Sequence, residues 1–415
     1  MEHVLTEVEK ERHSVIKACI DGDITNAVAA GRLGLSVRQV RRLKRKVEDR
    51  GEKGAIHGNH GQTSHNATDK KTRNAVVTFL KRPLHHDFGP TFAQEKLAEE
   101  NIVLSDETVR SIMTAENIWE PRRRRGSDIH REWRERKGMY GELVQFDGCY
   151  HIWLECRGGT TELCLLASID DATSMVPHKV FEDNEGVHAV FRFWWTYFEI
   201  HGLPVAIYLD KFSTYKINHV NAVDNDDMMT QFQRAMKQLD IRVINAHSPE
   251  AKGRIERLFE TLQDRLVKEM RLKHIHTRDA ANKYLFEQYT DEHNARFSVQ
   301  ARERGDAHRP LTKKLREQLP SILSIQSKRK VNNDYTVRFK NDWYQLAATQ
   351  KTTVYKRDEV TIETRLDGSV HIRLKGIYLA YTKLPARPER TKMKVTALTR
   401  EKPRWTPPKD HPWRK

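Results

Sequence analysis

The chain has 415 residues, too many for one ordinary domain, and this length favours two to four domains. Its 73 Lys and Arg residues outnumber its 57 Asp and Glu residues, and the formal charge of +16 indicates a polyanionic partner, with nucleic acid first. A hydrophobic fraction of 38% argues against wholesale disorder, four cysteines without CxxC spacing argue against a zinc ribbon or disulfide scaffold, and the most apolar stretch, 163–169, is too short to span a membrane.

Residues 1–60 are predicted to form a helix-turn-helix domain that binds double-stranded DNA. Ala30 is small where two helices must approach, Gly34 can adopt the positive φ of the turn, and Ser36 can cap the second helix. A helix with this basic composition suits the major groove. Its candidate DNA-binding residues are Arg38, Gln39, Arg41, Arg42 and Arg45. The alternative is a helical hairpin whose basic face is only solvated.

Residues 67–120 resemble a second helix-turn-helix domain, although the turn lacks glycine and the last helix is less basic. Residues 121–140 form a basic linker that could lie along DNA phosphates or simply be solvated. Its strongest candidates for phosphate contact are Arg122, Arg123, Arg124 and Arg125.

Residues 141–308 change in character to alternating strands and helices, which predicts an α/β core with a mixed sheet. Asp147 and Asp210 each directly follow a predicted hydrophobic strand, and such positions open onto a crevice in α/β sheets. Glu256 lies early on a predicted long helix, beside its apolar stripe, from which a carboxylate can reach the sheet edge.

Three converging carboxylates repel one another unless cations neutralise them, and ligands that are all oxygen select Mg²⁺ or Mn²⁺. Two such ions would hold a scissile phosphate for in-line displacement by water or a 3′-hydroxyl. Spacing alone is a weak signal, because a chain with 57 acidic residues offers many such triples.

The segments around these three acids resemble a known family. They are Gly141–Gly148, Tyr208–Lys211 and Ser248–Arg257. The chain resembles transposases of bacterial insertion sequences that have a retroviral-integrase-like DDE core, especially the ISNCY group. This resemblance implies an RNase H-like fold with Asp147, Asp210 and Glu256 as catalytic residues that hold two metal ions per active site.

Several other residues near the three acids bear on this site. Lys211-Phe212 stand where many integrase-like enzymes have Asn-Gly, and Glu260 is an alternative third ligand. Lys252 and Arg254 could hold phosphates beside the cut or belong to a solvated loop. Asp170 and Asp171 are predicted to make a turn rather than to enter the site.

Residues 325–385 are predicted to form a small antiparallel β-barrel, and residues 386–415 a basic disordered tail. We therefore expect a multidomain transposase in the bacterial cytoplasm, associated with the nucleoid, which acts on transposon ends and target DNA as at least a dimer and has no membrane partner. The alternatives are a domesticated, catalytically inactive DNA-binding regulator and a metal-dependent nuclease that only hydrolyses DNA.

Overall fold

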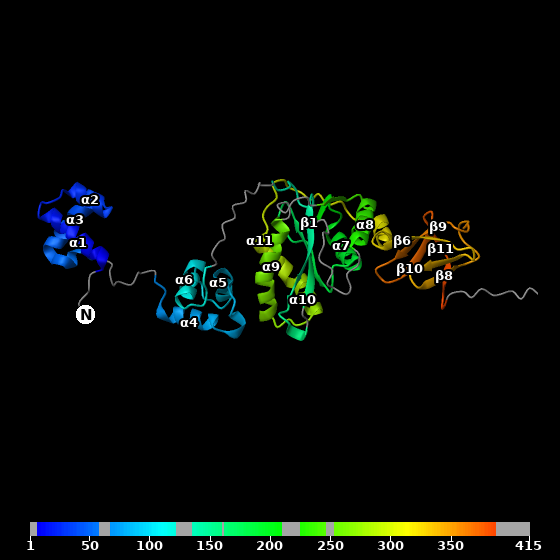
Figure 1. The fold of residues 1–415 in the computed structure, drawn as a ribbon, viewed down its shortest axis with the longest axis horizontal. Helices are drawn as coiled ribbons and strands as arrows, with labels where there is room; N and C mark the ends of the chain where they lie inside the picture. The colour runs from blue at the N-terminus through cyan, green and yellow to red at the C-terminus, as the bar shows by residue number, and fades with distance from the viewer. Residues whose placement is uncertain are drawn as a thin grey trace, which may run out of the picture. The chain divides into compact units, whose positions relative to one another are not determined.

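A computed structural model describes residues 6–57, 67–121, 135–159, 162–209, 225–245 and 253–386 (Figure 1). The chain divides into two units, Met1–Arg122 and Arg123–Lys415, each of which is described by itself. None of the helices in these ranges is long and apolar enough to cross a membrane.

The first helices are α1 (Glu7–Ile20), α2 (Asn26–Leu33) and α3 (Val37–Arg50). They pack around a small core that includes Ile16, Ala30 and Val40. Gly34 ends α2 with a φ of 63°, in the left-handed region that glycine adopts without a Cβ penalty. Ser36 caps α3 by accepting a hydrogen bond from the backbone N–H of Gln39. These helices and their turn lie where the sequence predicts them.

The next helices are α4 (Lys70–Leu80), α5 (Pro90–Glu99) and α6 (Asp106–Ala115). The turn between α5 and α6 contains Asn101, whose φ is 63°. Asparagine tolerates the left-handed region better than most residues, so it replaces the glycine that this turn lacks. Ser105 caps α6 through the backbone N–H of Thr108, at 3.1 Å.

The core of the second unit is a five-stranded sheet in the order β3-β2-β1-β4-β5. Its strands, in chain order, are β1 (Val144–His151), β2 (Leu163–Asp170), β3 (Lys179–Glu182), β4 (Ala206–Leu209) and β5 (Arg242–Asn245). The strands β1, β2 and β3 are antiparallel neighbours, whereas β4 runs parallel to both β1 and β5. The predicted mixed sheet is therefore confirmed.

Helices cover both faces of this sheet (Figure 1). The apolar residues of α7 (Val187–His201) and α8 (Asn225–Gln238) form one core cluster with Val144 and Phe146 of β1. The other cluster joins β2 to α9 (Gly253–Leu272), α10 (Arg278–Tyr284) and the π-helical turn Leu285–Tyr289, which continues into α11 (Thr290–Phe297).

The apolar and aromatic residues of the segment 151–156 favour a strand, but the structure has no strand beyond His151 in this segment. The strand β1 ends at His151, and the chain then turns through Glu155 and Cys156, which have φ values of 50° and 61°. In the segment 172–179, which could also form a strand by its sequence, only the last residue, Lys179, belongs to one.

The helix α12 (Lys313–Ile322) packs against the α7 side of the core through Leu319 and Ile322. Beyond it, two antiparallel sheets enclose a separate apolar core. One sheet has the order β11-β10-β9-β6 and the other β12-β8-β7. Their strands are β6 (Ile325–Lys330), β7 (Thr336–Phe339), β8 (Asp342–Leu346), β9 (Glu359–Thr364), β10 (Val370–Leu374), β11 (Ile377–Leu379) and β12 (Tyr381–Leu384).

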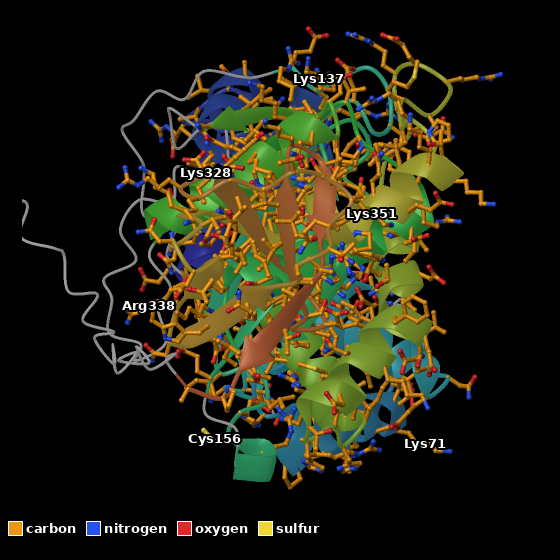
Figure 2. The ribbon with its side chains drawn as sticks, turned by 90° about the vertical axis from the view of Figure 1, so that its right-hand side faces the viewer. Lys71, Lys137, Cys156, Lys328, Arg338 and Lys351 are labelled. Carbon is orange, nitrogen blue, oxygen red and sulfur yellow. The ribbon has the colours of Figure 1, made fainter. Side chains whose placement is uncertain are left out.

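The antiparallel strands of the C-terminal region were predicted, but the closed barrel is not found within residues 325–386. The chain changes sheet at Ala380, between β11 and β12, so that the strands pair in two groups instead of one ring. Lys328, Arg338 and Lys351 are exposed basic side chains of this region (Figure 2).

Candidate active site

Asp147 lies on the face of β1 that α9 covers. Successive side chains of a strand point to opposite faces. Val144 and Phe146 enter the cluster under α7, whereas Cys149 packs against the cluster that contains α9. Asp147 shares its side of the strand with Cys149 and is half-buried.

The position of Asp147 within its strand differs from the expectation. It was predicted to follow the strand directly, but it lies inside β1, opposite Ala167 of β2. The strand continues to His151 because the residues after Asp147 also pair with β2, as far as His151 opposite Leu163.

Glu256 is exposed in the first turn of α9, beside the stripe by which this helix packs onto β1 and β2. Since each helical residue turns by about 100°, Glu256 and Gln263 share one flank of the stripe, and Arg254 lies on the other. The Gln263 amide donates a hydrogen bond to the Cys149 thiol sulfur at 3.3 Å. The flank of α9 that carries Glu256 is therefore the one that meets the strand of Asp147.

Asp210 lies outside the described residues. It comes directly after β4, which pairs in parallel with β1 through Val144 opposite Ile207 and Gln145 opposite Tyr208. Among the side chains that the structure describes, no three acidic, histidine or cysteine residues are grouped so as to hold a metal ion. Two of the three predicted ligands thus lie on elements in contact, and the third is not described.

Arg254 contacts a buried carboxylate. Its guanidinium lies 2.7 Å from an oxygen of Asp171, which is wholly buried just beyond β2. The same carboxylate accepts hydrogen bonds from the Gln145 amide and from the backbone N–H of Lys137, both at 2.9 Å. The sequence predicts a turn at Asp171 but not this contact. The one sequence feature that could have indicated it is the arginine two positions before Glu256.

The neighbouring Asp170 stabilises the turn that follows β2. Its carboxylate accepts hydrogen bonds from the backbone N–H of Gly141 at 2.9 Å and from the N–H and hydroxyl of Thr173 at 2.8 and 2.7 Å. Burial raises the pKa of Asp170, and these hydrogen bonds oppose the rise. Asp170 thus makes the turn that the sequence predicts.

The thiol beside Asp147 is held in its neutral form. Burial raises the pKa of Cys149, the hydrogen bond from Gln263 opposes this effect, and the charge of Asp147 adds to it. A thiol with a raised pKa is a poor nucleophile.

The predicted DNA-binding residues of α3 lie on its exposed side. They are Arg38, Gln39, Arg41, Arg42 and Arg45. The side-chain oxygen of Gln39 accepts hydrogen bonds from the backbone N–H and the hydroxyl of Ser36, both at 2.9 Å, so that Gln39 also caps the helix. The remaining candidates, Arg122, Arg123, Arg124, Arg125 and Lys252, lie outside the described residues.

No family model matches the sequence. The protein named "Putative transposase y4bF" of Sinorhizobium fredii is 35% identical over 378 residues, which cover 91% of this chain and 81% of that protein. The chain belongs to the transposases of bacterial insertion sequences. The transposase of insertion sequence IS1202 from Streptococcus pneumoniae is 28% identical over 98% of this chain and 93% of its own length. The chain described here is accordingly an enzyme of DNA transposition and integration.

Weaker similarity links the transposase to solved retroviral structures. An intasome of simian T-cell lymphotropic virus, solved with the PP2A regulatory subunit B56 gamma, aligns with 70% of this chain and 95% of its own at 14% identity and a TM-score of 0.32. The integrase catalytic core of HTLV-2, solved in complex with magnesium, aligns with 36% of this chain and 87% of its own at 16% identity and a TM-score of 0.28.

Proposed function

We propose that this transposase binds the terminal inverted repeats of its insertion sequence, cleaves DNA there to expose 3′-hydroxyl ends and joins these ends to target DNA. Asp147, Asp210 and Glu256 are the proposed catalytic residues. The observation that carries the proposal is that Asp147 and Glu256, far apart in the sequence, lie on a strand and a helix that pack together, with the Glu256 flank toward that strand.

These three side chains fit hard divalent cations because they offer only carboxylate oxygens. Mg²⁺ or Mn²⁺, with two ions per active site, would polarise the scissile phosphate and lower the pKa of the attacking hydroxyl. The half-buried Asp147 would hold its place through the rigid sheet, and the exposed Glu256 leaves its side of the site open to a duplex. The role of Asp210 rests on its position after β4, the parallel neighbour of β1.

We assign recognition of the ends to α3 and its exposed arginines, which the buried Val40 and Val47 orient outward. The residues 67–121, the basic linker with Arg122–Arg125 and Lys252 add contacts to DNA phosphates. Two ends must be held together for joining, so at least a dimer acts on DNA. The basic C-terminal region serves DNA contact or assembly.

The test compares the wild type with Asp147→Asn on labelled element ends in Mg²⁺. The variant keeps the shape of the side chain but removes a ligand charge, so we expect end binding within about two-fold of the wild type and loss of both cleavage and joining. Cleavage by Asp147→Asn at the wild-type rate would refute the assignment.

Glu256→Gln and Glu260→Gln, one helical turn apart on α9, identify the third ligand. Loss of cleavage in Glu256→Gln alone supports Glu256, and the reverse result assigns the role to Glu260. End binding by the wild type with no cleavage or joining in Mg²⁺ or Mn²⁺ would instead indicate the inactive DNA-binding regulator.

A further inference from the structure

Asp171 joins three segments of the second unit at one buried point. One carboxylate oxygen accepts from the Gln145 amide on β1 and from the guanidinium of Arg254 on α9. The other accepts from the backbone N–H of Lys137, in the segment that enters the core from the basic linker. The Asp171 backbone N–H donates to the carbonyl of Leu143 at 2.9 Å, which fixes the residue beside β1.

A buried carboxylate is stable only when its charge and its hydrogen-bonding capacity are satisfied. Arg254 supplies the charge, and its own side chain is only 17% exposed. Removal of one partner of a buried ion pair costs several kcal/mol in other proteins. The ion pair therefore fixes the first turn of α9 relative to the sheet, both in its position along the helix axis and in its rotation about that axis.

The positions of the two partners connect this ion pair to the proposed catalytic acids. Gln145 precedes Asp147 by two residues on the same face of β1. Arg254 precedes Glu256 by two residues on α9, on the opposite flank of the packed stripe. We propose that Asp171 is a positioning residue for the active site, which holds Arg254 and Gln145 and thereby sets the distance between the carboxylates of Glu256 and Asp147.

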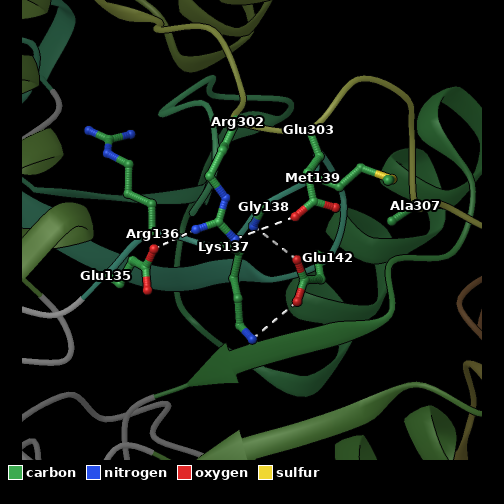
Figure 3. A pocket seen from close by; sticks show the side chains of 9 residues that line it. All are labelled: Glu135, Arg136, Lys137, Gly138, Met139, Glu142, Arg302, Glu303 and Ala307. Atoms are coloured by element: carbon green, nitrogen blue, oxygen red, sulfur yellow. Dashed lines mark hydrogen bonds and ion pairs between the residues drawn. The ribbon is translucent and has the colours of Figure 1, made fainter.

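The turn that carries Asp171 also anchors the end of the basic linker. Arg136 donates to the hydroxyl of Ser174 at 2.8 Å and to the carbonyl of Ala172 at 3.3 Å. In the next residues, Lys137 pairs with Glu142 at 3.1 Å, and the same carboxylate accepts from the N–H of Gly138 (Figure 3). These contacts hold the backbone N–H of Lys137 in place as a donor to Asp171.

This inference rests on the proposed function, and the test uses the full-length protein. Asp171→Asn keeps the size of the side chain but removes the charge that holds Arg254. We expect end binding to stay within two-fold of the wild type and the Mg²⁺ concentration for half-maximal cleavage to rise about ten-fold or more, as is typical when a residue that orients a metal ligand is changed.

A matched control is available at the other end of the same helix. Arg271 of α9 has a side chain only 6% exposed and pairs with Glu155 through its Nε atom at 2.9 Å. Glu155→Gln breaks an ion pair that also fixes α9 to the segment after β1, but far from Glu256. We expect Glu155→Gln to lower thermal stability without a change in the Mg²⁺ concentration for half-maximal cleavage.

Arg254→Lys is the second variant, because it keeps a positive charge beside Asp171 and is expected to fold even if Asp171→Asn does not. Its half-maximal Mg²⁺ concentration should lie between those of the wild type and Asp171→Asn. An unchanged Mg²⁺ dependence in both variants, or the same change in Glu155→Gln, would overturn the inference. The outcome for Asp147→Asn is separate, since full activity of that variant would refute the proposed metal ligands whatever Asp171→Asn does.

Discussion

At the scale of single residues, Lys179 is an ionisable group that is buried in the core. It begins β3 and is buried, with its ammonium 2.9 Å from the hydroxyl of Thr290 and 5.3 Å from the centre of the Tyr289 ring. Burial lowers the pKa of Lys179 to about 7, and the nearby charge of Asp291 opposes this shift. The neutral form therefore predominates in the folded protein above neutral pH.

The lowered pKa predicts a pH-dependent stability that Lys179→Met removes. The unfolded chain holds this proton up to the ordinary pKa of 10.5, so between about pH 7 and 10.5 it binds more protons than the folded state. The destabilising effect of the lysine is complete below pH 7 and disappears as the pH approaches 10.5. Each pKa unit corresponds to about 1.4 kcal/mol, and the lost contacts to Thr290 and Tyr289 offset part of the gain.

We expect Lys179→Met to be more stable than the wild type at pH 7 by on the order of 1 kcal/mol or more, and this advantage to shrink toward pH 10. Urea unfolding of both proteins at several pH values measures the difference directly. The comparison cancels the titration of other groups, such as Cys149, which both proteins share. A difference that stays constant over this pH range would contradict the lowered pKa.

Residues with local roles could be predicted from the sequence, whereas those with distant partners could not. Gly34 and Ser36 act on neighbours within the same turn, and Glu256 follows the apolar period of its own helix. Asp171 has the opposite character, because its partner Arg254 lies 83 positions away. The residues next to Asp171 in the sequence indicate only a turn.

At the scale of elements, β3 is an edge strand of the core sheet. Side chains, instead of another strand, form hydrogen bonds with backbone groups on its outer side. The amide of Asn282 on α10 accepts from the N–H of Phe181 at 2.7 Å and donates to its carbonyl at 3.0 Å. Asn294 on α11 makes the same pair of bonds to Val176, at 2.8 and 3.1 Å. These amides satisfy backbone groups that would otherwise be open to another chain.

Asn282→Ala should therefore destabilise the core, because it leaves the N–H and carbonyl of Phe181 without this partner. Loss of partners for buried polar groups costs about 1–3 kcal/mol. Amide hydrogen exchange at Phe181 and the urea midpoint report the loss. Gln288→Ala is the control, because Gln288 is an exposed amide that bonds to Glu292 on the surface, and we expect a change below about 0.5 kcal/mol.

The helices could be predicted better than the strands, for physical reasons. A helix satisfies its own backbone, so capping residues and apolar period define it. The segment after His151 is apolar and aromatic, which favours a strand, but Trp153 is buried and donates to the carbonyl of Cys149 at 3.2 Å, which folds the chain back. The two C-terminal sheets depend likewise on which strands pair, and turn signals alone do not determine this.

At the scale of the whole molecule, the exposed arginines of α3 and the proposed metal ligands lie in different units. The exposed arginines of α3 belong to Met1–Arg122, and the proposed metal ligands belong to Arg123–Lys415. This division predicts that changes in α3 affect affinity for DNA without an effect on the chemical step.

Salt dependence of binding separates basic residues that contact phosphates from those with structural roles. A protein that neutralises DNA phosphates releases counterions, so the logarithm of its affinity falls linearly with the logarithm of salt concentration, by about 0.9 for each phosphate contact. With a formal charge of +16 we expect a steep slope for the wild type. Arg41 and Arg42 are both exposed on α3, and the double variant Arg41→Ala, Arg42→Ala should reduce the slope by about 1 to 2.

Lys44→Ala is the matched control on the same helix. The Lys44 ammonium donates to the backbone carbonyl of Cys19 at the end of α1, at 2.9 Å, so it stabilises the packing of α3 against α1. We expect Lys44→Ala to lower the melting temperature of this region while the salt slope, measured by fluorescence anisotropy on an end-derived duplex, stays unchanged. Equal slopes for the wild type and the double arginine variant would remove α3 from the DNA interface, because a charge that contacts phosphates cannot be lost without a change in counterion release.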